Sequence, residues 1–403
     1  EQSWEQAFSW YRRGAECGDP VSMCNLGLCY EKGCGVEADP VQAFWLYQQA
    51  VEMGSLNAVC CLGVCYEHGI GTAPDAKQAA ELYRKAAEYG SPRGQMLLAH
   101  AFHDGIGVEA DAAEAVHWVR AAAYQRYGEG MHRLGVCYEY GDGVEQNWEH
   151  AVHWFREAAE SGVSAAMTDL GYCYEKGCGV EQSWEQAFSW YRRGAECGYP
   201  VSMSNLGLCY KRGYGVEQNW QEAIKWYEQG AQCGDLQSMH NLARCYERGE
   251  GVEQNEDRAL YWYRRGAEAG SDYCMYCLGW NYSNGEGVEQ NMTEAIRWYA
   301  AAAEGGNADA MHELGWHYDH GEGVEQDMKK AICWYERAAE QNHPAAMNSL
   351  GECYAMGRGV PRDLETAMEW YRRAAELGEA MADYNMGWHL SLIHISEPTR
   401  HAQ

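Results

Sequence analysis

The sequence lacks long apolar runs, is poor in proline, and has far fewer basic than acidic side chains. No apolar run approaches the ~20 residues that a helix needs to span a bilayer, so we predict no membrane span. Lys and Arg number 31 against 59 Asp and Glu, which gives a net charge of −28. A surface this acidic repels phosphate backbones, so nucleic acid is not an expected partner. The acidic residues are spread along the chain, as on a solvated surface.

An initiator methionine and a recognisable signal peptide are also missing, because the chain opens at Glu1 just before a predicted helix. We therefore expect the amino-terminal end of the natural protein to be absent, and the compartment stays open. The 18 cysteines show no regular pairing pattern, which favours a reducing compartment such as the cytoplasm. A secreted or periplasmic protein is the alternative.

What the sequence does have is a strict internal repeat. Pairs of glycines of the form G-x-G recur every 36 residues with no insertion, and their first members lie at positions 33, 69, 105, 141, 177, 213, 249, 285, 321 and 357. Alanine recurs on the same step from Ala7 to Ala367. A period of this length predicts stacked helical hairpins, because one hairpin cannot bury its apolar stripes alone.

Each unit is predicted to hold two amphipathic helices, of which the second covers residues 184–197 in one example unit. Its apolar side chains recur at helical spacing, at Ala187, Trp190, Tyr191, Gly194 and Ala195. In every copy the preceding residue can cap the first turn: Ser3, Asp39, Asp75, Asp111, Asn147, Ser183, Asn219, Asn255, Asn291, Asp327 and Asp363. Glycine ends most copies, whereas Asn342 and Arg126 end two of them, and we expect a looser corner at Arg126.

The first helix of the example unit covers about residues 201–211 and ends at Gly213. Its predicted packed face consists of Met203, Leu206, Gly207 and Tyr210. Gly207 has no side chain, so we expect a partner helix to approach closely at this point.

The combined pattern resembles the Sel1-like repeat family, which is related to the tetratricopeptide repeat. One copy carries the matching text A-x-x-W-Y-x-x-A-A-E and M-x-x-L-G-x-x-Y-x-x-G-x-G-V at Ala331, Trp334, Tyr335, Ala338, Ala339, Glu340, Met347, Leu350, Gly351, Tyr354, Gly357, Gly359 and Val360. The resemblance covers residues 1–389 and implies an all-α, right-handed superhelical α/α solenoid of about eleven 36-residue helix-turn-helix units. It also implies a protein that holds other proteins together.

Some copies depart from the pattern. The third unit has Leu98-Ala99 where Leu-Gly is expected, and it has Val119 where a tyrosine is expected. Leu46 and Leu82 replace tryptophan in two other units. These departures show where the repeated packing must be different.

Two further features concern the history of the chain. Residues 1–37 nearly copy residues 181–217, with a few differences that include Glu31 against Lys211, so we infer the duplication of a five-unit block. Residues 390–403 abandon the repeat and read LSLIHISEPTR followed by HAQ, which looks like translated read-through of a sequencing-library adapter. We predict a disordered, non-biological tail there, with a natural amphiphilic tail as the alternative. The continuous array of residues 1–389 is then truncated at both ends.

None of the cysteine, histidine or glycine patterns predicts a metal, a cofactor or a catalytic group. Cys274 and Cys277 lack the second pair that a zinc site needs. His312 and His317, at i and i+5, do not share a helix face. The G-x-G segments are expected to be turns. Seven cysteines occupy one register position and are expected to be buried small hydrophobes: Cys29, Cys65, Cys137, Cys173, Cys209, Cys245 and Cys353.

The positions that vary between units offer the best indication of function. On the first helix, positions 204, 208 and 211 cluster beside the packed face, and their equivalents change freely from unit to unit. First helices line the inner surface of the solenoids that this chain resembles, so we interpret this ribbon as the ligand face. The predicted partner-binding residues are His240, Arg244, Tyr276, Trp280, His312, Trp316, Asp319 and Glu352. Neutral drift on a solvated face is the alternative.

The expected function is a non-enzymatic scaffold or adaptor that binds a protein or peptide on the inner face of the solenoid. No nucleophile and base are recognisable at a shared position in the sequence, so we do not expect an enzyme. The alternative is an enzyme-associated regulator or a secreted hydrolase resembling the cysteine-rich Sel1-like subgroup. A convergent acid, base and nucleophile in the inner groove would favour that alternative.

Overall fold

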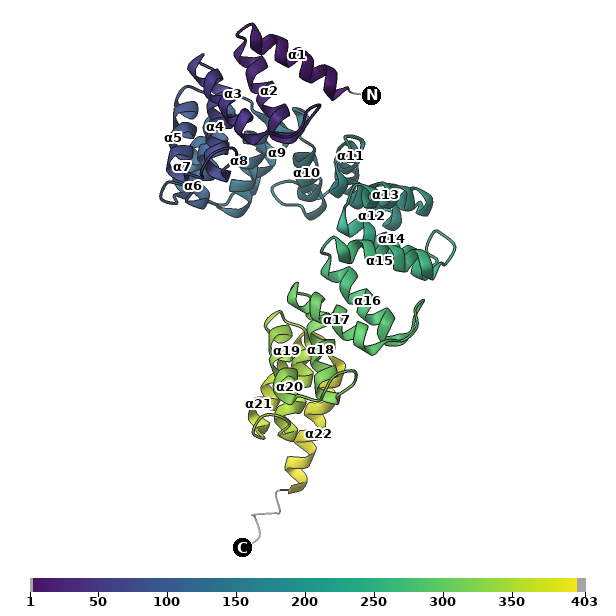
Figure 1. Ribbon diagram of the computed structural model, residues 1–403. Helices are drawn as coiled ribbons and strands as arrows, with labels where there is room; N and C mark the ends of the chain where they lie inside the picture. The colour runs from purple at the N-terminus through teal and green to yellow at the C-terminus, as the bar shows by residue number, and fades with distance from the viewer. Residues whose placement is uncertain (1–2, 397–403) are drawn as a thin grey trace. The chain divides into compact units, whose positions relative to one another are not determined.

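A computed structural model describes residues 3–396, which form helices joined by short turns and contain no β-strand (Figure 1). The odd-numbered helices match the second helix of each predicted unit: α1 (Trp4–Glu16), α3 (Pro40–Glu52), α5 (Ala76–Glu88), α7 (Ala112–Tyr124), α9 (Trp148–Glu160), α11 (Trp184–Glu196), α13 (Trp220–Gln232), α15 (Glu256–Glu268), α17 (Met292–Glu304), α19 (Met328–Glu340) and α21 (Leu364–Glu376).

The even-numbered helices match the first helix of each predicted unit: α2 (Pro20–Lys32), α4 (Leu56–His68), α6 (Pro92–Asp104), α8 (Gly128–Tyr140), α10 (Ser164–Lys176), α12 (Pro200–Arg212), α14 (Leu236–Arg248), α16 (Asp272–Asn284), α18 (Ala308–His320), α20 (Pro344–Met356) and α22 (Ala380–Ser396). The alternation of the two helix types along the described chain confirms the predicted all-α solenoid.

The helices divide between two compact units. The N-terminal unit consists of residues 1–202 and 213–217, and the C-terminal unit consists of residues 203–212 and 218–403. Within each unit, helices that are consecutive in the sequence pack against each other (Figure 1). Every binding surface described below lies inside one unit.

The predicted helix ends are confirmed. Every odd-numbered helix is capped by the predicted side chain, which accepts a hydrogen bond from a first-turn backbone N–H. Arg126 and Asn342 adopt the left-handed conformation of the glycines at the equivalent corners, with φ of 60° and 61°. The N–H of Arg126 donates to the carbonyl of Ala123 at 2.8 Å, so its corner closes like the others and is not looser.

The core is built from a contact between an aromatic ring and a glycine on the preceding helix. The ring of Tyr191 on α11 lies against Gly171 on α10, where a Cβ atom would come within 2.5 Å of Cε1 of the tyrosine. The same pairing recurs at Gly27–Tyr47, Gly63–Tyr83, Gly135–Phe155, Gly207–Tyr227, Gly279–Tyr299, Gly315–Tyr335 and Gly351–Tyr371. These rings are fully buried. The close approach predicted at Gly207 is therefore confirmed, with a ring filling the space.

A hydrogen bond completes this contact in several repeats. The hydroxyl of Tyr191 donates to the carboxylate of Glu175 on α10 at 2.8 Å. Equivalent bonds join Tyr47 to Glu31, Tyr83 to Glu67, and Tyr263 to Glu247. Each such glutamate lies one helical turn after the position that receives the ring, so one tyrosine both packs on and bonds to the preceding helix.

The seven in-register cysteines are buried, as predicted, and no cysteine within residues 3–396 forms a disulfide. Five of them, Cys65, Cys137, Cys173, Cys245 and Cys353, lie in the same apolar clusters as the rings. Burial raises the pKa of Cys137 to about 11, so its thiol stays protonated at neutral pH and acts as a small apolar group.

The end of the chain is helical for longer than the sequence pattern suggested, because the backbone of α22 stays helical to Ser396. Residues 397–403, which hold the rest of the predicted non-biological tail, lie outside the described residues, and the origin of the tail stays a prediction. Within residues 3–396, no helix is both long enough and apolar enough to cross a bilayer.

The tyrosine hydroxyl gives a matched test of this packing. Tyr191→Phe removes the bond to Glu175 and should lower the free energy of unfolding by about 1 kcal/mol. Lys211 stands where Tyr227 would need a glutamate, and the buried hydroxyl of Tyr227 has no hydrogen-bond partner among the described residues. Tyr227→Phe should therefore be neutral or stabilising. Urea denaturation of both variants checks this, and equal losses would show that the hydroxyl bond is not the cause.

Candidate partner-binding surface

The variable ribbon lies on the even-numbered helices, and in the C-terminal unit it forms a hollow. His240 and Arg244 lie one turn apart on α14, and Tyr276 and Trp280 lie one turn apart on α16. All four line a single cavity of about 520 Å³. The structure thus brings together half of the predicted partner-binding residues.

One side of this hollow is aromatic. The imidazole of His240 lies 5.7 Å from the ring of Tyr273 and 6.2 Å from that of Tyr263, measured between centroids. Tyr276 lies deeper, 5.9 Å from the buried ring of Tyr299. Trp280 is 41% exposed at the rim. Exposed aromatic side chains around a concave surface are typical of sites that take an apolar group from a partner.

His240 is the unusual polar group of the hollow. Its Nδ1 atom is buried and has no hydrogen-bond partner among the described residues. Burial, together with the positive charges of Arg244 and Lys211, lowers the pKa of His240 to about 4. The imidazole is therefore neutral at physiological pH.

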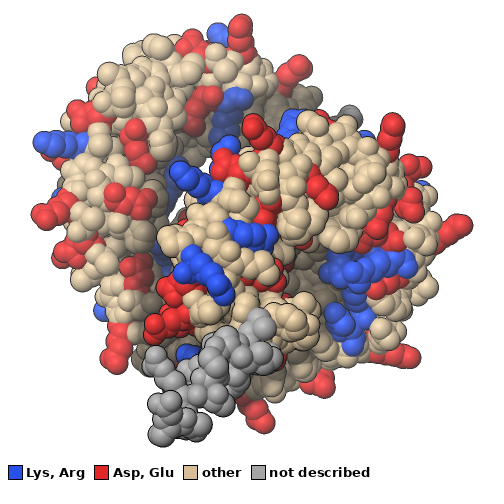
Figure 2. Space-filling model, turned by 90° about the horizontal axis from the view of Figure 1, so that it is seen from below, with Lys and Arg blue, Asp and Glu red and all other residues tan. Residues whose placement is uncertain are grey.

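Basic side chains gather beside the same hollow. Arg244 also lines a second cavity of about 370 Å³, together with Lys211, Arg212, Arg248 and Trp220. Within residues 3–396, Arg212 and Arg244 form no ion pair. On the face seen in Figure 2, Lys and Arg side chains gather in a few groups, whereas Asp and Glu side chains are scattered. In a chain of net charge −28, the basic side chains that line the second cavity are a local exception, and they can attract an acidic group.

Sequence reasoning missed Arg212, Arg248 and Trp220 as site residues, and it placed Lys211 on the ribbon without naming it among the partner-binding residues. The ammonium group of Lys211 bonds to Glu250 at 2.8 Å and lies 5.2 Å from the ring centroid of Trp220. The available signal was the replacement of Glu31 by Lys211 between two otherwise similar blocks. That replacement removes the glutamate that bonds to the buried tyrosine in other repeats, and it adds a positive charge at the ribbon.

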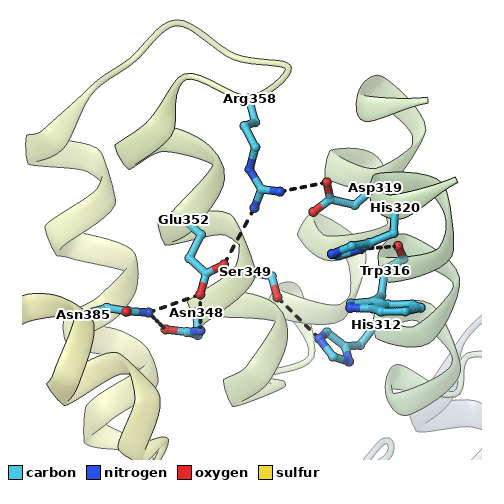
Figure 3. Close-up of polar contacts among 9 residues, drawn as sticks. All are labelled: His312, Trp316, Asp319, His320, Asn348, Ser349, Glu352, Arg358 and Asn385. Atoms are coloured by element: carbon cyan, nitrogen blue, oxygen red, sulfur yellow. Dashed lines mark hydrogen bonds and ion pairs between the residues drawn. The ribbon is translucent and has the colours of Figure 1, made fainter. Parts of the chain in front are cut away.

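The ribbon continues from α16 to α18. Trp280, His312 and Trp316 line another cavity of about 440 Å³. The ring of Trp316 stacks on His320, with centroids 4.3 Å apart, and His312 points toward Ser349 (Figure 3). Because Trp280 lines both this cavity and the one at His240, six of the eight predicted residues lie around two adjoining hollows.

Asp319 and Glu352 are placed differently. Arg358 lies between them, 3.0 Å from Asp319 and 3.7 Å from Glu352 (Figure 3). Asp319 is only 4% exposed, and Glu352 also accepts hydrogen bonds from Asn348 and Asn385. Both carboxylates are thus engaged in contacts between neighbouring repeats. This differs from the exposed position that the ribbon pattern gave them.

The other histidines of this region, His317 and His320, lie in different surroundings. His317 is buried, and its Nδ1 lies 3.0 Å from the backbone carbonyl of Glu322. His320, one turn later, is exposed and lies against Trp316. In the part of the chain that the structure describes, no group of His, Cys, Asp and Glu side chains is arranged to hold a metal ion.

Comparison with protein families gives a match along nearly the whole chain. The model described as the Sel1 repeat matches residues 5–19, 20–55, 58–91, 92–127, 128–163, 164–199, 200–235, 236–271, 272–307, 308–343 and 344–379. These segments follow the 36-residue period, and from residue 20 onward each holds one even-numbered helix and the odd-numbered helix after it.

Two solved structures are similar to this chain. One is c5321, a protective antigen of uropathogenic Escherichia coli strains with an SLR fold. It is 35% identical, with a TM-score of 0.59, over 94% of this chain and 81% of that one. The other is a Sel1 repeat protein from Oxalobacter formigenes, 33% identical with a TM-score of 0.57, over 61% of this chain and 99% of that one. No curated protein matches the chain in sequence.

The low pKa of His240 predicts a pH effect with a definite sign. In the unfolded chain the imidazole should titrate near 6.5, whereas in the folded protein its pKa is about 4. Between these values the unfolded state binds more protons, so the free energy of unfolding should fall as the pH is lowered from 6.5 toward 4. Denaturation at several pH values should show a smaller fall for His240→Gln than for the exposed control His153→Gln. Equal pH profiles would contradict this.

Proposed function

The chain belongs to the Sel1 repeat family, and on that premise we propose that it is a non-enzymatic scaffold whose C-terminal unit binds a protein or peptide. The binding surface is the variable ribbon of α14, α16 and α18. The observation that carries the proposal is the hollow in which His240, Arg244, Tyr276 and Trp280 lie together. These residues come from positions where the repeats differ, so the hollow is a property of this unit rather than of every repeat.

The chemistry of the hollow indicates the kind of segment that would fit. Tyr273, Tyr276 and Trp280 offer an apolar surface for a hydrophobic or aromatic side chain. Arg244 and Arg248 lie beside that surface and can pair with a carboxylate. A partner segment with an acidic residue close to a hydrophobic one would satisfy both.

The enzymatic alternative has less support from the same hollow. Cys277 is the only thiol that lines it. Burial raises the pKa of Cys277 to about 12, so little of the nucleophilic thiolate exists at neutral pH. The hollow is also lined by neutral His240, by cationic Arg244 and by the carboxylates Glu247, Glu286 and Asp309, of which Glu247 is bonded to Tyr263 and Asp309 to His343.

Replacing the two indoles of the ribbon tests the proposal. Trp280→Ala with Trp316→Ala should weaken binding of the natural partner by about 30-fold or more, as expected for aromatic hot spots. The matched control is Tyr172→Ala, because Tyr172 occupies the register position of Trp280 on α10 and is 43% exposed. Partners would be retained on immobilised protein, identified by quantitative mass spectrometry, and titrated after purification.

The two variants separate the possible outcomes. Loss with the double variant and retention with Tyr172→Ala would place the binding surface on the ribbon of the C-terminal unit. Equal retention by the double variant and the unmodified protein would contradict the proposal. Circular dichroism of each variant checks that the helices remain intact.

A further inference from the structure

The third repeat of the N-terminal unit lacks the aromatic ring that the repeats around it insert between their helices. Val119 on α7 occupies the register position of Tyr83 on α5 and Phe155 on α9. Ala99 on α6 stands where most repeats place the glycine that receives the ring. Valine is much shorter than tyrosine, so it cannot fill the same space against the preceding helix.

A hollow of about 690 Å³ lies at this place. Ala99 and Val119 are part of its floor and are themselves buried. His103, Arg133 and Cys137 also line it. The cavity is the largest of those described in the molecule, and it lies entirely inside the N-terminal unit.

The positions that line this hollow are those that surround a ring elsewhere in the chain. The hydroxyl of Tyr263 donates to Glu247 at 3.2 Å, and the same side chain contacts Cys277. Glu247 and Cys277 hold the register positions of His103 and Arg133 in the third repeat. The hollow therefore contains the binding surface for a phenol ring, with a histidine and an arginine in place of the usual neighbours.

The charges around the hollow leave two cations available. Within residues 3–396, neither Arg93 nor Arg133 forms an ion pair, and a guanidinium nitrogen of Arg93 contacts the sulfur of Cys61 at 3.6 Å. The four carboxylates that line the hollow each have a partner, in the pairs Glu67–Tyr83, Asp104–His100, Glu129–Tyr127 and Asp142–His103. Arg93 and Arg133 are thus guanidinium groups without an ion pair, beside four carboxylates that already have hydrogen-bonding partners.

We infer that this hollow is a binding site for a ligand that carries an aromatic ring next to an anionic group. The ring takes the place of the missing side chain against Ala99 and Val119. The anion pairs with Arg133 or Arg93. The site is independent of the ribbon in the C-terminal unit. The ligand is either a free aromatic acid or an aromatic side chain beside an acidic residue in a peptide.

Calorimetric titration with small probes tests the site in the unmodified protein. We expect saturable binding of 4-hydroxyphenylacetate, at least about tenfold tighter than that of p-cresol, which lacks the carboxylate. Arg133→Gln should remove most of this preference and leave p-cresol binding unchanged. Arg126→Gln is the matched control, because Arg126 is an exposed arginine of the same unit outside the hollow. Failure of both probes to bind at about 10 mM overturns the inference.

Filling the hollow from within tests its position. Val119→Tyr should fold, because Tyr263 already coexists with an alanine, Ala243, at the receiving position. It should weaken binding of 4-hydroxyphenylacetate at least about tenfold. The double variant Ala99→Gly with Val119→Tyr recreates the commoner pair and should behave in the same way, with a melting temperature no lower than that of the unmodified protein. Unchanged binding in a folded variant overturns the inference.

A last comparison identifies the source of the ligand. A blocked dipeptide, acetyl-Tyr-Glu-amide, is titrated beside 4-hydroxyphenylacetate. Tighter binding of the dipeptide supports an aromatic side chain of a peptide in this hollow, and tighter binding of the free acid supports a small-molecule site. Both results require a ligand with an aromatic ring and an anionic group, as the geometry of the hollow indicates.

Discussion

The contact between an aromatic ring on one helix and a glycine on the helix before it is the interaction on which the array depends. A helical hairpin of 13-residue helices cannot bury its own apolar face, so the repeats must stack. The ring at Tyr191 and its equivalents packs the two helices of each repeat together, and the glycine at Gly171 gives it room. In several repeats the ring hydroxyl also bonds to a glutamate one turn further on, which fixes the position of the neighbouring helix.

Because the same contact recurs, the places where it changes stand out as candidates for function. Val119 removes the ring, and a hollow with unpaired arginines lies there. Lys211 removes the glutamate that would bond to Tyr227, and a cluster of basic side chains gathers beside the ribbon of α14. The array thus keeps its fold by repetition and obtains distinct surfaces by local exceptions, which suits a scaffold that recognises more than one group.

Much of the fold could be predicted from the sequence. The period, the capping side chains, the left-handed corners and the burial of the in-register cysteines follow from local spacing, which sequence reasoning reads well. The candidate site was predicted only in part. His240, Arg244, Tyr276 and Trp280 share a hollow because they lie one turn apart on neighbouring helices. The burial of Asp319 depends on Arg358, which belongs to the next repeat, and no spacing along one helix reveals it. For the same reason the hollow at Val119 could be noticed as a departure but not seen as a cavity.

Hydrogen exchange measured by mass spectrometry tests most directly whether the ring contact holds the two helices of a repeat together. Helices α6 and α7 lie in the interior of the N-terminal unit but meet without the ring. The account predicts that their amides exchange faster than those of α4 and α5 before them, and of α10 and α11 after them, where Tyr83 and Tyr191 close the interface. Protection of α6 and α7 equal to or greater than that of these neighbours would contradict the account.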